Sequence, residues 1–147
     1  MARKCIAPLS ASQAAPWHPS CVAEVMAGAI LVVDDDVALA DSLREPLASE
    51  DVQIESAVDA PSACVLLDGR TFCGLVLDLV LDDSSGFEVL RHLKKQGITI
   101  PTIVVTQKLP SYVREMLAEE QVKLVFPKPV EARLLGAVVL GLCGIAN

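Results

Sequence analysis

The 147-residue sequence has no apolar stretch long enough to cross a membrane as a helix. Such a span needs about 20 uninterrupted apolar residues, and the longest apolar stretch, residues 134–145, is shorter and contains three glycines. Prolines and polar residues between positions 8 and 16 also interrupt any apolar core of a signal peptide. We therefore expect a cytoplasmic protein without membrane contact, with a core built from the 52% of residues that are apolar.

Clustered basic residues and metal-binding cysteine pairs are missing as well. The net charge is −7, which argues against a nucleic-acid binder, because phosphate contacts need grouped Lys and Arg. The five cysteines form no C-x-x-C pair, and no His lies at metal-ligand spacing from them, which argues against a zinc site. We expect reduced thiols, with Cys64, Cys73 and Cys143 as small core residues.

Short β-branched runs alternate with helical patterns along most of the chain. Strands are predicted at residues 30–33, 52–57, 75–77, 103–105 and 122–126, and helices at 37–49, 61–67, 86–96, 110–121 and 130–142. Pro46 should kink or shorten the first helix, and Gly97 should cap the third. Residues 1–28, rich in Pro, Ala and Ser, are predicted to be a disordered tail. The βα alternation from residue 29 to 147 predicts an α/β fold with a doubly wound, five-stranded parallel sheet and five helices.

Polar residues follow the predicted strands where ligands gather in such sheets, at the strands' carboxyl ends. They are Asp34, Asp35 and Asp36 after the first strand, then Asp78, Thr106 and Lys128. Two carboxylates about 4 Å apart repel by about 4 kcal/mol at an effective dielectric constant of 20, so their convergence predicts a cation. All-oxygen ligands favour Mg²⁺. A carboxylate beside Mg²⁺, with a hydroxyl and an ammonium nearby, is suited to accepting a phosphoryl group.

Four segments resemble the ordered motifs of response-regulator receiver domains of two-component signalling. They are Val32-Val33-Asp34-Asp35, Leu77-Asp78 with Gly86 eight residues later, Val104-Val105-Thr106, and Phe126-Pro127-Lys128-Pro129. The intervals between the site residues are 44 residues from Asp34 to Asp78, 28 to Thr106 and 22 to Lys128. The resemblance covers roughly residues 29–143 and implies a flavodoxin-like sheet with strand order 2-1-3-4-5.

The resemblance also implies a role for each matching residue. Asp78 corresponds to the phosphoacceptor, Thr106 to the switch hydroxyl and Lys128 to the phosphate-binding lysine. Asp34 and Asp35, with Asp78 and the backbone carbonyl of Val80, correspond to the Mg²⁺ ligands. The Lys128–Pro129 peptide corresponds to one that is cis in the family. For Asp36 we favour a helix N-cap over a metal ligand, and we expect His92 and His18 to be surface residues without partners.

The sequence departs from the family pattern mainly on the surface where phosphorylation is read out. Val125 occupies the position of the aromatic switch residue, and Phe126 should point to the opposite face of its strand. Gln107 replaces a small residue beside Thr106. The loop after Asp78 lacks the usual Pro, and residues 119–122 lack the usual Gly-Ala turn.

Three functions are therefore weighed. The first is a phosphoacceptor served by a histidine kinase or phosphotransfer protein, which acts on a downstream protein target. The second is a non-switching receiver that works as a docking or dimerisation module. The third is a haloacid-dehalogenase-like phosphatase; Asp34-x-Asp36 fits its signature, but Ala38 breaks it. We expect no classical enzyme activity, no attached effector domain and no direct nucleic-acid contact, although the chain could be one domain of a larger regulator. The apolar last helix leaves a homodimer open.

Overall fold

The computed structural model describes residues 28–48, 50–107, 115 and 122–144. Five parallel strands form its central sheet: β1 (Gly28–Val33), β2 (Val52–Ala57), β3 (Gly74–Leu77), β4 (Thr102–Thr106) and β5 (Val122–Pro127). Their order is β2-β1-β3-β4-β5, as predicted. β3 and β4 are buried along their whole length, because strands in the middle of a doubly wound sheet are covered on both faces.

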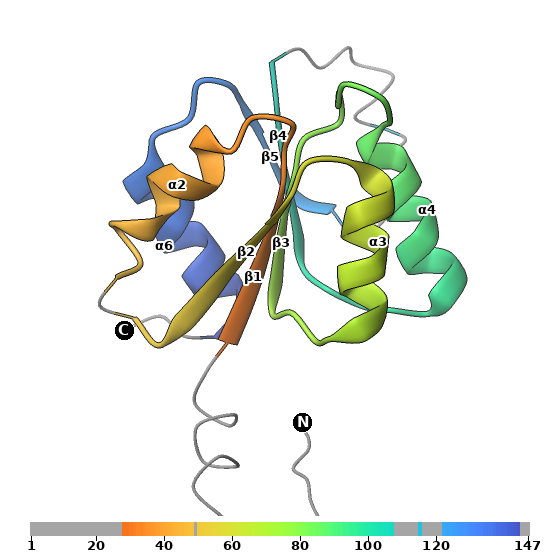
Figure 1. Ribbon diagram of the computed structural model, residues 1–147. Helices are drawn as coiled ribbons and strands as arrows, with labels where there is room; N and C mark the ends of the chain where they lie inside the picture. The colour runs from red at the N-terminus through yellow and green to blue at the C-terminus, as the bar shows by residue number, and fades with distance from the viewer. Residues whose placement is uncertain (1–27, 49, 108–114, 116–121, 145–147) are drawn as a thin grey trace, which may run out of the picture.

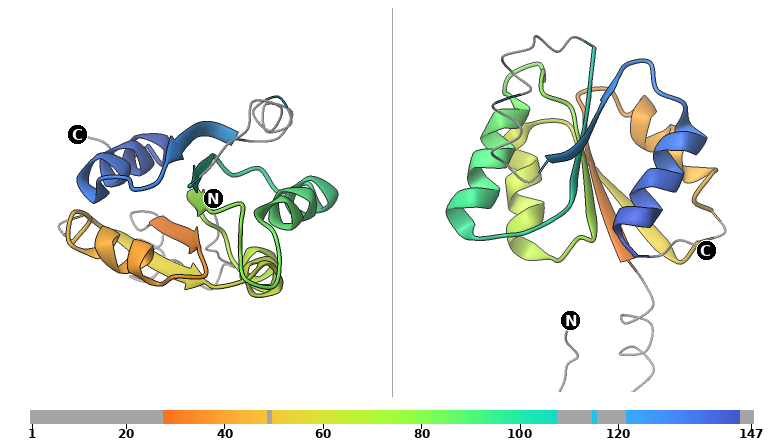
Figure 2. Two further views of the ribbon diagram at one scale, coloured as in Figure 1. Left: turned by 90° about the horizontal axis from the view of Figure 1, so that it is seen from above. Right: turned by 180° about the vertical axis from the view of Figure 1, so that it is seen from behind.

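The described residues form four helices, and these cover the two faces of the sheet (Figure 1). α2 (Ala38–Arg44) and α6 (Ala132–Leu142) lie on one face, and α3 (Ala60–Gly69) and α4 (Gly86–Gln96) on the other. The view from above in Figure 2 shows the resulting three layers. Alternate side chains of β1 enter opposite cores: Ile30 and Val32 pack beneath α2 and α6, whereas Leu31 and Val33 pack beneath α3 and α4.

Local signals account for where several helices begin and end. Asp59 accepts a hydrogen bond from the backbone N–H of Ser62 and caps α3, which has Pro61 in its first turn. Ser85 and Glu88 form a capping box at the start of α4. Gly97 ends α4 in the left-handed conformation at φ 69°, as predicted.

One predicted helix is longer than the observed one, and another is not tested by the described structure. The first was expected to run to residue 49, but α2 ends at Arg44, two residues before Pro46, whose ring and missing N–H are incompatible with a continuing helix. The helix predicted at 110–121 lies, apart from residue 115, outside the described residues and stays a prediction. The tail predicted for residues 1–28 also lies outside them, except Gly28, which begins β1. No helix in the described part of the chain is long and apolar enough to span a membrane.

Candidate functional site

The acidic side chains at the ends of β1 and β3 are brought together by strand pairing. Val33 and Leu77 are partners in the parallel register, so the residues that follow them, Asp34 and Asp78, leave the sheet side by side. The backbone N–H of Asp78 donates to the carbonyl of Val33 at 2.9 Å. Both carboxylates are nearly enclosed, with Asp34 3% and Asp78 5% exposed. Buried carboxylates need charged or hydrogen-bonding partners.

Lys128 supplies such a partner to both carboxylates. Its Nζ donates to Oδ2 of Asp34 at 2.7 Å and to Oδ2 of Asp78 at 2.8 Å. Partial burial alone would lower the pKa of Lys128, but the hydrogen bonds and charges of Asp34 and Asp78 outweigh it and raise that pKa above its usual value. The ammonium group therefore stays charged over the physiological range.

Backbone pairing between β4 and β5 places Lys128 beside the two carboxylates. β4 and β5 pair so that Thr106 lies opposite Pro127, and the backbone N–H of Lys128 donates to the carbonyl of Thr106 at 2.9 Å. The Lys128–Pro129 peptide is cis, as the resemblance implied. Thr106 is the last residue of β4 and is 2% exposed. The predicted hydroxyl and ammonium groups thus share one sheet edge with the two carboxylates.

A third carboxylate completes an arrangement that fits a metal ion. One oxygen each from Asp34, Asp35 and Asp78 lies within 4.8 Å of the others, and Asp35 is the most exposed of the three. An all-oxygen set of this kind, open to water on one side, suits Mg²⁺, which keeps several water ligands. The fit rests on the donor set, since hard oxygen ligands without thiolate or imidazole favour Mg²⁺ or Ca²⁺ over transition metals.

The loop after Asp78 is held without the proline that is usual in the family. The backbone N–H of Val80 donates to Oδ1 of Asp78 at 3.1 Å. Val80 and Ser85 form an isolated antiparallel bridge, and the Ser84 hydroxyl accepts from the N–H of Ala60 at the start of α3. The side chain of Val80 is 71% exposed. Ser84 was not predicted to take part, because its partner is 24 residues away and no local pattern signals the contact.

Asp36 lies beside the site, and its side chain forms a hydrogen bond with the backbone. Its Oδ1 accepts from the N–H of Ala38, the first residue of α2, although Val37 occupies the N-cap position itself. Its own N–H donates to Oδ1 of Asp34 at 3.0 Å. Asp36 thus acts close to the predicted capping role, one residue before the assigned cap, and its hydrogen bond helps to orient Asp34.

Two of the departures from the family pattern are visible around the site. Gln107 is exposed and lines a groove with Asp34, Asp36 and Lys128, so its side chain stands at the entrance to the carboxylates. Val125 packs against the core beneath α3 and α4, whereas Phe126 packs against the core beneath α2 and α6. The prediction that Phe126 points away from the face occupied by Val125 is confirmed.

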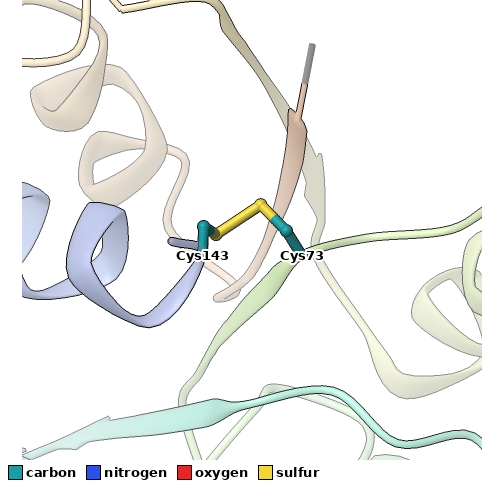
Figure 3. Close-up of a disulfide and its surroundings, with 2 residues drawn as sticks. All are labelled: Cys73 and Cys143. Carbon is teal, nitrogen blue, oxygen red and sulfur yellow. A yellow bond between two sulfur atoms is a disulfide. The ribbon is translucent and has the colours of Figure 1, made fainter. Parts of the chain in front are cut away.

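The structure corrects two predictions made for residues outside the site. Cys73 and Cys143 were expected to be separate, reduced core residues, but they are joined by a disulfide and are half-buried (Figure 3). No sequence signal marked the pair, because 70 residues separate the two cysteines. His92 was expected to lack a partner, yet its Nε2 lies 2.8 Å from Oδ1 of Asp68. α3 and α4 pack side by side and bring these two residues together.

The chain belongs to the response regulator receiver domain family, which matches residues 30–140. Response regulators are components of two-component signalling. This membership, together with the sheet order and the cluster of aspartates, argues against the haloacid-dehalogenase-like alternative.

Individual relatives agree with this assignment. The chain is 37% identical over 79 residues to the response regulator MprA of Mycobacterium sp. (strain KMS), which is 54% of this chain and 34% of that protein. The same identity is found with MprA of Mycobacterium avium (strain 104). The chain thus matches about a third of the length of these relatives.

Solved structures of receiver domains have the same fold. A CheY-like receiver domain from Methanospirillum hungatei JF-1 superposes with a TM-score of 0.69 at 27% identity, covering 80% of this chain and 95% of that one. The non-phosphorylated HemR receiver domain from Leptospira biflexa gives a TM-score of 0.71 at 25% identity, covering 82% and 97%.

Proposed function

We propose that this receiver domain takes a phosphoryl group from a partner histidine kinase, or a phosphotransfer protein, onto Asp78 in a Mg²⁺-dependent reaction. The observation that carries the proposal is the double hydrogen bond of Lys128 to the buried carboxylates of Asp34 and Asp78. A lysine held this way neutralises charge at the position where a phosphoryl group on Asp78 would add more.

Each residue of the site has a separate role in the proposed phosphoryl transfer. A carboxylate oxygen of Asp78 bonds to phosphorus while the bond from phosphorus to the donor's histidine nitrogen breaks, and that nitrogen takes up a proton. Asp34, Asp35, Asp78 and the carbonyl of Val80 would hold Mg²⁺, which when bound neutralises charge on the phosphoryl oxygens. The hydroxyl of Thr106 would donate to one phosphoryl oxygen, and the ammonium of Lys128 would pair with another.

The proposed activity is tested by mass. The protein is incubated with Mg²⁺ and acetyl phosphate, a small phosphodonor that replaces the kinase, and its intact mass is recorded. We expect a single phosphoryl adduct that is absent in EDTA and absent in Asp78→Asn. Asp36→Asn is the matched control, because an Asn side chain still accepts from the N–H of Ala38, and this variant should be labelled like the parent. An adduct that survives Asp78→Asn would overturn the assignment.

A second measurement tests Mg²⁺ binding in the absence of a phosphodonor. Mg²⁺ should raise the free energy of unfolding by about 2.7 kcal/mol at one hundred times its dissociation constant. Asp35→Asn should weaken this effect, because it removes the most exposed of the three carboxylates and leaves those of Asp34 and Asp78 in place. Stability that does not change with Mg²⁺ concentration would contradict a working metal site.

One observation favours a second candidate, a non-switching docking or dimerisation module. Val125 stands where an aromatic residue would couple Thr106 to the surface, and Phe126 packs on the opposite face of β5. Backbone hydrogen exchange before and after phosphorylation separates the two candidates. Altered exchange in β5 and α6 supports a phosphorylation-dependent change of contacts, whereas labelling of Asp78 without any such change supports the docking module. We propose a cytoplasmic location for either.

A further inference from the structure

The disulfide between Cys73 and Cys143 lies at the end of β3 opposite to Asp78. Figure 3 shows the bond. Cys73 directly precedes β3, whose opposite end leads to Asp78, and Cys143 directly follows α6. Their Cα atoms lie 5.0 Å apart, inside the usual range for bridged cysteines. The bond therefore fastens the C-terminal end of α6 to the amino end of the central strand.

Neighbouring residues also contact the two bridged cysteines. The backbone N–H of Cys73 donates to the carbonyl of Ala29 at 2.8 Å, which ties it to β1. A Cβ added to Gly74 would lie 3.1 Å from Sγ of Cys143 and 3.5 Å from Cγ1 of Val139. The side chain of Cys143 therefore occupies the space beside this glycine. Gly74 thus leaves room for the side chain of Cys143 beside the start of β3.

The last turn of α6 has few other attachments. Leu135, Gly136 and Val139 are its buried residues, whereas residues 140–144 are half-buried or exposed. Gly141 is inside this turn and has open space around its Cα, and glycine disfavours a helical conformation. Without a bond at Cys143, the turn is held mainly by partly buried leucines. The order of this turn should therefore depend on the state of the two sulfurs.

We propose that Cys73 and Cys143 form a reversible redox site, oxidised by a low-molecular-weight disulfide such as glutathione disulfide. One thiolate attacks the oxidant to form a mixed disulfide and releases one glutathione thiol. The second thiolate then displaces the other glutathione, so the protein loses two electrons and two protons, and one glutathione disulfide is reduced to two glutathione thiols. The half-buried position of both cysteines makes them reachable by such an oxidant. In a reducing compartment, disulfides are chiefly transient and redox-sensing.

The experiment isolates this pair in the full-length chain. The parent for all measurements is Cys5→Ser/Cys21→Ser/Cys64→Ser, which keeps only Cys73 and Cys143 as thiols. It is equilibrated in glutathione buffers of increasing oxidised fraction. The free thiols are then blocked with an alkylating reagent, and the intact mass of the protein is measured. Melting temperature and backbone hydrogen exchange are recorded at both extremes. Cys73→Ser in the same background is the control, and Cys143→Ser serves if that variant does not fold.

We expect half-oxidation at an intermediate glutathione ratio, with loss of the mass of two hydrogen atoms. The melting temperature should rise by about 5–10 °C on oxidation, because the bond closes a long loop in the unfolded chain. Hydrogen exchange of residues 140–144 should slow by on the order of tenfold. The single-cysteine control should show none of these shifts.

Three results would overturn the proposal. Thiols that remain alkylatable at every glutathione ratio would show that the pair does not form the bond. A bond that persists in excess reduced glutathione would make it a permanent structural link. Equal melting temperature and exchange in both states would show that α6 does not depend on it. The outcome is independent of whether Asp78 is phosphorylated, because no phosphodonor is present.

Discussion

Lys128 is the residue on which the charge balance of the site depends. Its ammonium group is the common partner of Asp34 and Asp78, which are otherwise nearly shut off from water. Removal of one partner from a buried ion pair leaves an uncompensated charge, which is costly. Here two carboxylates would be left, and they would also repel each other. Because Lys128 is itself partly exposed, water would recover part of the loss.

We expect Lys128→Met to lower the free energy of unfolding by about 1–3 kcal/mol in EDTA at pH 8. Mg²⁺ should restore much of this stability, because it supplies positive charge to the same carboxylates. Urea denaturation with and without Mg²⁺ measures both effects. Lys123→Met, on an exposed part of β5, is the control and should change stability little. A loss that Mg²⁺ leaves untouched would mean that the ion does not bind at these carboxylates.

The contribution of Lys128 also has a defined pH range. Because its pKa is raised in the folded protein, the stabilisation is fully present below the ordinary lysine pKa of about 10.4 and is lost as pH rises through the higher folded value. The difference in unfolding free energy between the parent and Lys128→Met should therefore be constant in EDTA from neutral pH to about pH 10, once the carboxylates are ionised. A difference that already shrinks near pH 8 would argue against a charged Lys128.

Cys64 should be a poor nucleophile. Burial raises the pKa of its thiol, and the negative charges of Asp68 and Glu88 raise it further, so less thiolate is present at neutral pH. We expect alkylation by iodoacetamide to be severalfold slower than for the same cysteine in denatured protein. The midpoint of alkylation, the pH at which its rate is half-maximal, should lie above the usual cysteine pKa of about 8.5. Asp68→Asn should lower that midpoint. Peptide mapping of the alkylated protein reports Cys64 separately, and a midpoint below the usual value would contradict the prediction.

At the scale of elements, two glycines in helices should respond in opposite directions to the same substitution. Gly86 begins α4, where a Cβ would overlap the backbone carbonyl oxygen of Asp78 and lie 3.0 Å from Cα of Leu79. Gly141 in α6 has nothing within 4 Å of an added Cβ. The start of α4 can therefore approach the end of β3 only because residue 86 has no side chain.

We expect Gly86→Ala to destabilise the fold by about 1–3 kcal/mol and to reduce labelling of Asp78, because the loop that carries the Val80 carbonyl must shift. Gly141→Ala should stabilise the fold by about 0.5–1 kcal/mol through helix propensity. Urea denaturation and acetyl phosphate labelling of both variants give the comparison. If Gly86→Ala is as stable as the parent, the close approach of α4 to Asp78 is not required.

β5 carries the departure from the family pattern at position 125. Val125 and Phe126 pack in opposite cores, so they cannot exchange roles without a shift of register. Restoring an aromatic residue therefore requires substitution at position 125 itself. Phe126 itself packs beneath α2 and α6, on the other side of the sheet from Val125.

At the scale of the whole molecule, the sheet separates two apolar cores that share no side chains among the described residues. Ile30 belongs to the core beneath α2 and α6, and Ile100 to the core beneath α3 and α4. We expect Ile30→Val and Ile100→Val each to cost about 0.5–1.5 kcal/mol. In the double variant the costs should add to within about 0.5 kcal/mol, because the two side chains pack in different cores. Urea denaturation of the four proteins tests this, and strong coupling would indicate that strain passes through the sheet.

Most of the fold and the site could be predicted from short-range patterns. The strands β1, β3 and β4 are compact apolar runs that end at a polar residue, and parallel pairing puts such ends on one edge of the sheet. The positions of Asp34, Asp78 and Lys128 followed from that rule and from the family motifs. The pairing of Lys128 with Asp34 did not follow, because side-chain direction depends on the register between β4 and β5 and on the hydrogen bond from Lys128 to Thr106.

Several contacts that escaped prediction join residues distant along the chain. Ser84 meets Ala60, His92 meets Asp68, and Cys73 meets Cys143 across 24, 24 and 70 residues. By itself the amino-acid sequence determined the strands, the helix caps and the residue types at the strand ends, because these depend on local periodicity and propensity. Only the tertiary structure decided which side chains touch, because helices from opposite ends of the chain must first pack on the same sheet.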